Sequence, residues 1–209
     1  ETWQEAKVIG LFHLTGTAME IFKVNAGSWA YPEDAFFIVV NVPLFSGFMY
    51  ASVGSYIARV VRIFDMRFTS YPPFWIPVVL AVAIYLNFFS HHFLPDIRLA
   101  LFAATVIVFW RTHVVFSLGR NYALPLPLAA LFASFFLWIA ENVGTLTGTW
   151  VYAGSRTFEM TSISILGSWY LLLYVAFVTV TLVIREPLNI KGSRATSERS
   201  ATPPRQGSD

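Results

Sequence analysis

Six long apolar runs, separated by short polar connections, dominate this chain. They cover residues 8–24, 35–58, 73–90, 97–116, 126–144 and 163–184. Most are close to the roughly 20 residues that a helix needs to cross the hydrocarbon core of a bilayer. Lipid offers no hydrogen bonds to a backbone, so such runs fold as helices that satisfy their own N–H and C=O groups. The sequence predicts an all-α fold, a polytopic membrane helix bundle with about six transmembrane helices. Pro43 and Pro77 lie inside runs and predict kinks.

The composition favours a membrane protein without a separate soluble domain. Hydrophobic residues make up 56% of the chain and charged residues 12%, against about 45–50% and 25% in an ordinary soluble domain. The absence of Cys excludes disulfides and thiolate metal sites. After residue 184 the chain is rich in Ser, Arg, Thr and Pro, which is typical of disorder. We expect a transmembrane helical domain over residues 1–184 and a disordered cytoplasmic tail over residues 185–209.

The basic residues are distributed unevenly between the two sides that six spans would create. Eleven of the 14 Lys and Arg residues fall on one side, and only Lys23, Arg98 and Arg156 fall on the other. Cytoplasmic loops carry the excess of Lys and Arg in membrane proteins. We therefore expect a multi-pass protein of the bacterial inner membrane, with both termini of this chain in the cytoplasm. The net charge of +2 follows from this topology and does not indicate nucleic acid as a partner.

One short pattern occurs twice: a carboxylate, six residues, Gly, a hydroxyl residue, Trp, one further residue and Tyr. The second copy lies 121 residues after the first, and each closes an apolar run. The copies are Glu20, Gly27, Ser28, Trp29 and Tyr31, and Glu141, Gly148, Thr149, Trp150 and Tyr152. Both would lie on spans of the same direction, so a duplication would be a parallel repeat of four-helix units. Two complete units need further spans before Glu1, and we expect an amino-terminal part to be missing.

The aromatic residues and the carboxylates of this pattern need different explanations. Trp and Tyr at the ends of spans are typical of the aromatic belt at a membrane interface. An ionised carboxylate at membrane depth costs at least about 2.5 kcal/mol, so it faces the bundle interior and has a partner. A structural ion pair or a helix-end interaction would also account for Glu20 and Glu141, and this alternative stays open.

Further polar residues are expected on the same outer side as the two carboxylates. His13 shares a helix face with Glu20, and Asn87 shares one with His91. These groups predict one intramembrane polar site. Its predicted catalytic residues are Glu20, Glu141, His91 and His13. Its predicted substrate-binding residues are Asn87, Tyr50, Asn142, Trp29, Trp150, Tyr31, Tyr152 and His92.

Carboxylates and imidazoles together could bind a divalent metal, shuttle protons, or protonate and deprotonate an apolar substrate. The four His residues are fewer than a His-ligated membrane desaturase site needs, so we predict no metal site and leave the cofactor open. Our hypothesis is acid/base chemistry on a lipid or isoprenoid-like substrate, with one Glu as proton donor. A proton-coupled transporter or carrier and a structural membrane assembly partner are the alternatives. Membrane lipids and an apolar small molecule are the expected partners, and the oligomeric state is left open.

Several segments carry a resemblance to a known family. They are the run from Glu1 to Phe22, Gly27 to Pro32 (GSWAYP), Val42 to Tyr56 (VPLFSGFMYASVGSY), Tyr85 to Asp96 (YLNFFSHHFLPD), Trp110 to Thr112 and Trp138 to Asn142 (WIAEN). In these the chain resembles DUF817, an uncharacterised bacterial integral membrane family. The resemblance implies a membrane location and a longer amino-terminal part. It does not indicate which activity the protein has.

A fainter likeness reaches the membrane carotenoid cyclases and hydratases. It is carried by Glu20, Gly27, Trp29, Tyr31 and the Pro43–Leu44 step. The cyclases follow their Pro-Leu step with carboxylates, whereas this chain has Phe45 and Ser46. This likeness implies at most a shared scaffold that binds long apolar molecules.

Overall fold

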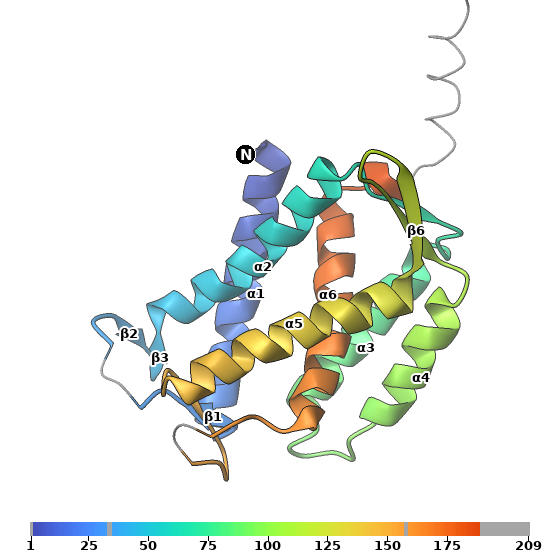
Figure 1. The fold of residues 1–209 in the computed structure, drawn as a ribbon. Coiled ribbons are helices and arrows are strands. Elements are labelled where there is room, and N and C mark those ends of the chain that lie inside the picture. Colours follow the sequence, from blue (N-terminus) through green and yellow to red (C-terminus); the bar gives the residue numbers. More distant parts are fainter. Residues whose placement is uncertain (1, 33–34, 157–158, 189–209) are drawn as a thin grey trace, which may run out of the picture.

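The computed structural model describes residues 2–32, 35–156 and 159–188. Within these ranges the chain forms a bundle of six α-helices that run alternately in opposite directions (Figure 1). This confirms the predicted all-α helix bundle. The helices are α1 (Trp3–Asn25), α2 (Leu44–Ile63), α3 (Trp75–Ser90), α4 (Arg98–Phe109), α5 (Leu126–Leu146) and α6 (Ile163–Val183).

The helices differ in how well they match the thickness of a bilayer. Among the described residues, α2, α5 and α6 are long and apolar enough to cross a membrane. Helix α1 has 23 residues but carries Glu5, Lys7, Glu20 and Lys23. Helices α3 and α4 are apolar but have only 16 and 12 residues, and α4 therefore extends about 18 Å. Three helices thus meet the requirement by length and composition, and the count of six spans stays a prediction.

Two of the predicted runs are not helical over their whole length. The run 35–58 begins with the β2–β3 hairpin, and α2 starts only at Leu44. Pro43 precedes α2 as its N-cap, because a Pro inside a helix would remove a hydrogen bond and disfavour helical geometry at the residue before it. Pro77 lies in the first turn of α3, where Pro is tolerated. Neither Pro is in a helix interior, and the prediction of kinks was wrong.

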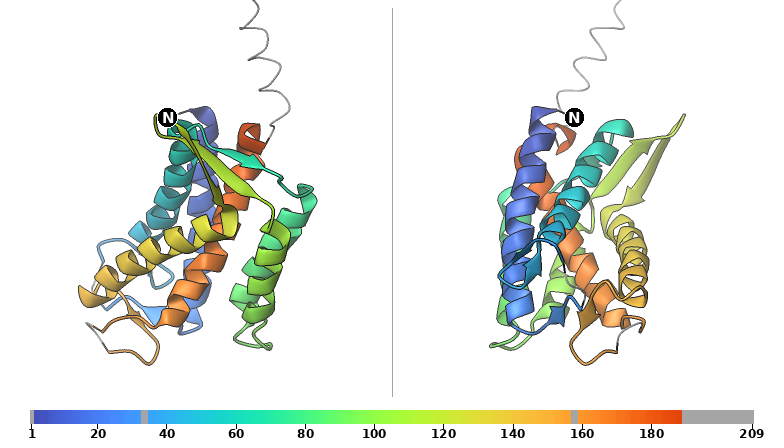
Figure 2. Two further views of the ribbon diagram at one scale, coloured as in Figure 1. Left: turned by 45° about the vertical axis from the view of Figure 1, so that its right-hand side comes forward. Right: turned by 90° about the vertical axis from the view of Figure 1, so that its left-hand side faces the viewer.

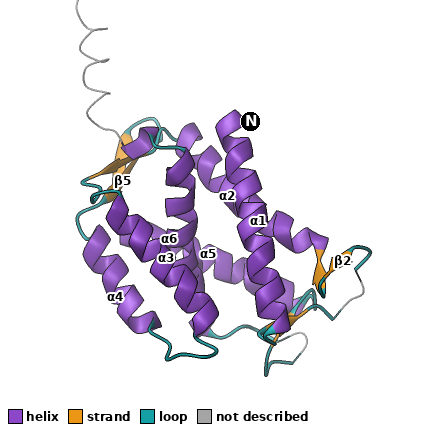
Figure 3. Ribbon diagram, turned by 180° about the vertical axis from the view of Figure 1, so that it is seen from behind, coloured by secondary structure: helices purple, strands orange, loops and turns teal. Residues whose placement is uncertain are grey.

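The run 97–116 also changes structure before its end. Helix α4 ends at Phe109, and β5 (His113–Ser117) follows. Strand β5 lies between β4 (Arg67–Thr69) and β6 (Asn121–Pro125) in an antiparallel sheet. This sheet and the 3-10 helix Glu186–Leu188 lie at the end of the bundle where the chain begins, which we call the N-terminal end (Figures 1 and 3).

Short strands also occur at the opposite end. Strand β1 (Trp29–Ala30) pairs antiparallel with β7 (Val151–Tyr152), which joins segments that follow α1 and α5. The hairpin of β2 (Ile38–Val39) and β3 (Val42–Pro43) projects beside them (Figure 1). We call this end the β1–β7 end. It contains the C-terminal ends of α1, α3 and α5 and the N-terminal ends of α2, α4 and α6.

Helix α6 lies at the centre and contacts the other five helices. Its side chains Tyr170, Leu171, Tyr174 and Val178 are buried in the main apolar core. Helix α1 packs along α2 on one side of α6, and α3 and α4 lie on another side (Figure 2). A central helix without a charged residue suits this position, since much of its surface packs against apolar side chains.

Close contact between α1 and α2 depends on glycine. A Cβ atom added at Gly54 of α2 would lie 2.5 Å from the Phe12 ring of α1, and one added at Gly16 of α1 would lie 2.5 Å from Tyr50 of α2. Real Cβ atoms essentially never approach so closely. Small residues that let two helices approach are common in membrane proteins.

The substitution Gly54→Ala is expected to destabilise the bundle by about 1–3 kcal/mol, because the added methyl group overpacks the contact with Phe12. Gly10→Ala on α1 is the matched control, since nothing lies within 4 Å of its added Cβ. This control should be neutral or stabilising by up to about 1 kcal/mol. Thermal unfolding of both variants in the same detergent measures the difference, and equal midpoints would contradict the packing.

Candidate functional site

A cavity of about 560 Å³ lies at the β1–β7 end of the bundle. Side chains of all six helices and of β1 and β7 line it. Both carboxylates of the repeated pattern, Glu20 and Glu141, are among the lining residues. They are nevertheless only 2% and 7% exposed. The partners of these carboxylates therefore decide what the cavity can do.

Glu20, near the end of α1, accepts three hydrogen bonds from aromatic side chains. Its Oε2 accepts from Trp29 Nε1 at 3.0 Å and from the Tyr31 hydroxyl at 2.8 Å. Its Oε1 accepts from the Tyr50 hydroxyl of α2 at 2.7 Å. Glu20 thereby connects α1, the β1 segment and α2.

Glu141, near the end of α5, has the corresponding set of donors. Its Oε1 accepts from Trp150 Nε1 at 2.8 Å and from the Tyr152 hydroxyl. Its Oε2 accepts from Trp169 Nε1 of α6 at 3.0 Å. Each carboxylate thus has one Trp and one Tyr from its own copy of the pattern and a third aromatic donor from the following helix.

The two tyrosines of the pattern act as donors. Burial, together with the neighbouring Glu20 carboxylate, raises the pKa of Tyr31. Burial and the Glu141 carboxylate likewise raise the pKa of Tyr152. A raised pKa keeps a phenol protonated at physiological pH. Both hydroxyls therefore hold a proton to donate to their carboxylate.

The remaining residues of the pattern shape the turn that brings the aromatic side chains back to the carboxylate. Gly27 and Gly148 have φ angles of 72° and 75°, in the left-handed region that glycine adopts without steric cost. The next N–H groups turn back to the helix: Ser28 N donates to Lys23 O, and Thr149 N donates to Gly144 O. The glycine at this position closes the helix, so that the Trp and Tyr two and four residues later can reach the Glu.

The two copies pair with each other in a symmetric register. Trp29 lies opposite Tyr152, and Ala30 lies opposite Val151. Ala30 and Val151 hold the same position in the two copies, so an approximate two-fold axis passes between them. The rings of Trp29 and Tyr152 meet edge to face at 5.9 Å. The two copies therefore stabilise each other's position, and both carboxylates lie at the same cavity.

The structure brings together nine of the residues predicted for the site. Those that line the cavity are Glu20, Glu141, His91, His92, Tyr50, Trp29, Trp150, Tyr31 and Tyr152. His13 is not among the lining residues, although it lies two turns from Glu20 on α1. Its ring contacts the Phe48 ring of α2, with ring centroids 4.7 Å apart and the two planes tilted by 39°.

Asn87 and Asn142 also lie outside the lining of this cavity. Asn142 donates to Trp138 O and accepts from Thr161 N at 2.9 Å, so it anchors the segment that leads into α6. Asn87 donates to Asp96 and accepts from Ile97 N, which fixes the connection between α3 and α4. Both contacts are those of buried amides that complete the backbone hydrogen bonding of a loop.

Sequence reasoning missed several residues of the cavity. Trp169 donates to Glu141, but it lies in an apolar run where nothing distinguishes it from a packing residue. Lys23 and Arg98 line the cavity, although their charges indicated only the topology. In the parts of the chain that the structure describes, no group of three His, Asp or Glu residues could hold a metal ion.

The two carboxylates should respond differently to replacement by Gln. Both oxygens of Glu141 accept from indole N–H groups, which can only donate, so a Gln amide must place its NH₂ against an indole N–H. We expect Glu141→Gln to cost about 1–3 kcal/mol of stability. At Glu20, the NH₂ group can face the Tyr50 hydroxyl, which can rotate to accept, and Glu20→Gln should cost less than about 1 kcal/mol.

Thermal unfolding in detergent, followed by tryptophan fluorescence, measures both variants of this pair. Both variants lose one negative charge and differ in the donors that the new amide meets. An equal loss of stability in the two variants would contradict the assignment of donors.

Comparison with known proteins finds a matching family and a similar bacterial protein. Residues 1–177 match the family described as protein of unknown function (DUF817). The uncharacterized protein YoaT of Bacillus subtilis (strain 168) is 47% identical over 182 residues, which are 86% of this chain and 69% of that protein. The predicted resemblance to DUF817 is confirmed, and the likeness to carotenoid cyclases stays a prediction.

Two solved structures have a similar fold. One is a cross-linked trimer of a variant of MvINS, with a TM-score of 0.62 over 89% of this chain and 96% of that one. The other is MvINS, a mycobacterial Insig homolog from Mycobacterium vanbaalenii, with a TM-score of 0.58 over 86% and 95%. Sequence identity is 13% in both, so the likeness concerns the fold alone. The match over residues 1–177 and the identity to YoaT establish that the chain belongs to the DUF817 family.

Proposed function

We propose that this protein binds a lipid or isoprenoid-like molecule in the cavity at the β1–β7 end. The observation that carries the proposal is the cavity itself, about 560 Å³ in volume with a wall of aromatic side chains fixed by Glu20 and Glu141. Pockets for small molecules usually measure about 300–1,000 Å³ and combine an apolar wall with a few convergent polar groups. The cavity matches this description.

A second, deeper cavity supports an elongated ligand. It measures about 60 Å³ and shares Tyr50, Val53, Trp169 and Leu172 with the main cavity. Its other lining residues include Phe12, Met19 and Ala176, which are apolar and lie nearer the middle of the bundle. An apolar chain can follow this path from the main cavity inward, with its polar end left at the β1–β7 end.

The hydrogen bonds at the carboxylates support a positioning role for them more strongly than a role as proton donors. Every oxygen of Glu20 and Glu141 already accepts from at least one aromatic donor. A carboxyl group that passed a proton to a substrate would have to give up one of these bonds first. We therefore propose that the carboxylates orient Trp and Tyr side chains against the ligand.

The charge distribution supports an orientation in the membrane. Arg59 and Arg62 lie in the last two turns of α2, and Arg67, Arg111 and Arg120 follow α2 or α4, all at the N-terminal end. Under the positive-inside rule that end faces the cytoplasm. The cavity would then open in the outer half of the bilayer of the bacterial inner membrane. A transporter needs access from both ends, and the cavity at one end supports binding more directly than transport.

The substitution Ala140→Trp is expected to abolish ligand retention, because Ala140 of α5 lines the cavity and an indole would fill part of it. Ala133→Trp is the matched control, since Ala133 lies two turns earlier on the same face of α5 and is exposed outside the cavity. Protein purified from membranes in mild detergent is extracted with organic solvent, and co-purifying lipids are quantified by mass spectrometry. A loss of at least about tenfold corresponds to about 1.4 kcal/mol of binding free energy.

The result expected is one lipid class retained by the wild type and the control and depleted in Ala140→Trp. Retention of the same lipids at the same amount in all three proteins would reject the cavity as their binding site. Thermal unfolding of each sample checks that the protein is folded.

A further inference from the structure

Lys23 is a buried cation at the β1–β7 end of α1. Its side chain is 2% exposed and lines the main cavity. Its Nζ lies 3.1 Å from His92 Nε2 and 4.1 Å from the centre of the Phe88 ring. Among the residues that the structure describes, no carboxylate forms an ion pair with it, and Glu20, one turn earlier, has both oxygens bound by aromatic donors. A buried ammonium without a counter-ion is costly and marks a functional site by default.

His92 orients this ammonium without neutralising it. A charged Lys can only donate, so Nε2 of His92 is the acceptor of this contact. The Ser28 hydroxyl lies 3.1 Å from the same nitrogen. Burial and the nearby Lys23 charge lower the pKa of His92, which keeps this imidazole neutral. His92 is therefore a neutral acceptor and not a counter-ion for Lys23.

Comparison of the two copies of the repeated pattern shows independently that the turn after Lys23 does not require a lysine. The corresponding residue in the second copy is Gly144, whose carbonyl makes the same backbone hydrogen bond to Thr149 N. A Cβ atom at Gly144 would collide with the Trp150 ring. The turn thus forms without a lysine, and a lysine at this position is a difference between the copies that the shared geometry does not require.

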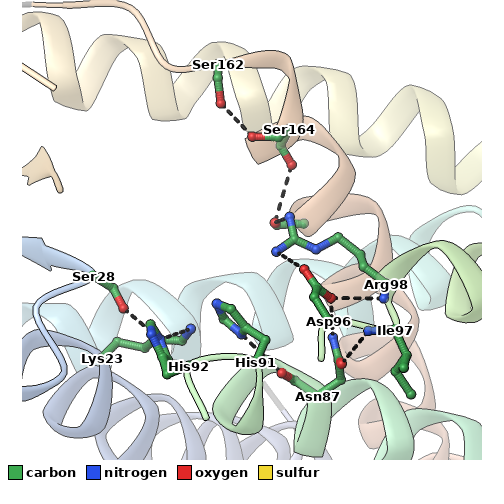
Figure 4. Close-up of polar contacts among 11 residues, drawn as sticks. Lys23, Ser28, Asn87, His91, His92, Asp96, Ile97, Arg98, Ser162 and Ser164 are labelled. Carbon is green, nitrogen blue, oxygen red and sulfur yellow. Dashed lines mark hydrogen bonds and ion pairs between the residues drawn. The ribbon is translucent and has the colours of Figure 1, made fainter. Parts of the chain in front are cut away.

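Arg98, at the start of α4, supplies a second cation to the same cavity. Its guanidinium contacts Asp96 at 3.0 Å and the Ser168 hydroxyl at 3.3 Å. Figure 4 shows the His91 side chain between the Lys23–His92 pair and the Arg98–Asp96 pair. One ion pair uses two of the five N–H donors of an arginine at most, so others are left for a ligand.

We propose that Lys23 and Arg98 bind the oxyanion head group of the amphipathic molecule that the cavity holds. This inference rests on the proposed function. A phosphate monoester or a carboxylate has the required chemistry, because its oxygens accept charge-assisted hydrogen bonds from ammonium and guanidinium groups. The aromatic donors around Glu20 and Glu141 cover the oxygens of those carboxylates, so the part of the lining that meets the head group is cationic. The apolar part of the ligand lies against Trp150, Trp169 and Leu172.

The experiment compares lipids that differ only in the head group. Brominated phosphatidic acid and brominated diacylglycerol with the same acyl chains are titrated into the full chain in maltoside micelles. Bromine quenches the fluorescence of Trp29, Trp150 and Trp169, which line the cavity. Wild type is expected to bind the phosphatidic acid at least about tenfold more tightly. Lys23→Met should remove this preference and leave diacylglycerol binding unchanged.

Lys7→Met is the matched control, since Lys7 lies on the same helix at the N-terminal end and is exposed. It should keep the preference of the wild type. If Lys23→Met does not fold, Arg98→Gln tests the second cation with the same expectation, and Lys23→Arg should retain binding of the anionic lipid.

The outcomes separate this inference from the proposed function. Equal affinity of wild type for both lipids would overturn the head-group assignment and leave the lipid cavity standing. No quenching by either lipid would overturn both. Inorganic phosphate is added as a competitor, and displacement of the lipid by millimolar phosphate alone would identify a free-phosphate site and overturn the lipid assignment.

Discussion

Two buried carboxylates, each bound by three aromatic donors, hold the β1–β7 end of this bundle together. Glu20 connects α1 with β1 and α2, and Glu141 connects α5 with β7 and α6. The pairing of β1 with β7 then joins the two sets. A carboxylate is costly to bury, but hydrogen bonds to a charged acceptor are about twice as strong as neutral ones. Removing either Glu would leave several buried donors unsatisfied, and the wall of the cavity would lose its fixed geometry.

The symmetric register explains why one pattern appears twice. An antiparallel pair of identical segments can be two-fold symmetric, and here the centre falls between Ala30 and Val151. Helices α1 and α5 both end at the β1–β7 end, although α5 crosses the bundle obliquely to α1 (Figures 1 and 2). The third donor breaks the symmetry, since it is a tyrosine on α2 for Glu20 and a tryptophan on α6 for Glu141. A parallel repeat of four-helix units remains a prediction that this local symmetry favours.

The sequence was most informative where a single physical requirement dominates. Lipid forces long apolar runs into helices, and the six runs correspond to the six helices of the described chain. Beyond the helices the apolar pattern gave the wrong expectation. Residues 36–40 are apolar but precede Pro43, and residues 114–116 are apolar but belong to a paired strand. Composition alone does not distinguish a β-branched segment at the end of a bundle from the continuation of a helix.

The site was predictable to the extent that its residues recur. The duplicated spacing identified both carboxylates and four of their six donors, because the turn and the donors are encoded within a dozen residues. Tyr50 was also predicted for the site, as a substrate-binding residue. Trp169 was not, since its contact with Glu141 depends on how α6 packs. His13, Asn87 and Asn142 were also predicted for the site but do not line the cavity, because a polar residue in an apolar run can serve a loop or a helix contact as readily as a ligand.

The arrangement of charges in the cavity allows an anion to be selected inside a site that also contains two carboxylates. Lys23 and Arg98 balance Glu20 and Glu141 in formal charge, which lowers the cost of placing all four groups within the bundle. The charges differ in availability, because the aromatic donors cover the carboxylate oxygens, whereas the ammonium contacts an imidazole and a phenyl ring. An incoming oxyanion therefore meets the Lys23 ammonium and those N–H donors of Arg98 that do not contact Asp96 or Ser168, and the carboxylates contribute rigidity to the opposite wall. The cavity suits an amphipathic anion because its cations can contact a ligand, whereas its carboxylate oxygens are already bound by aromatic donors.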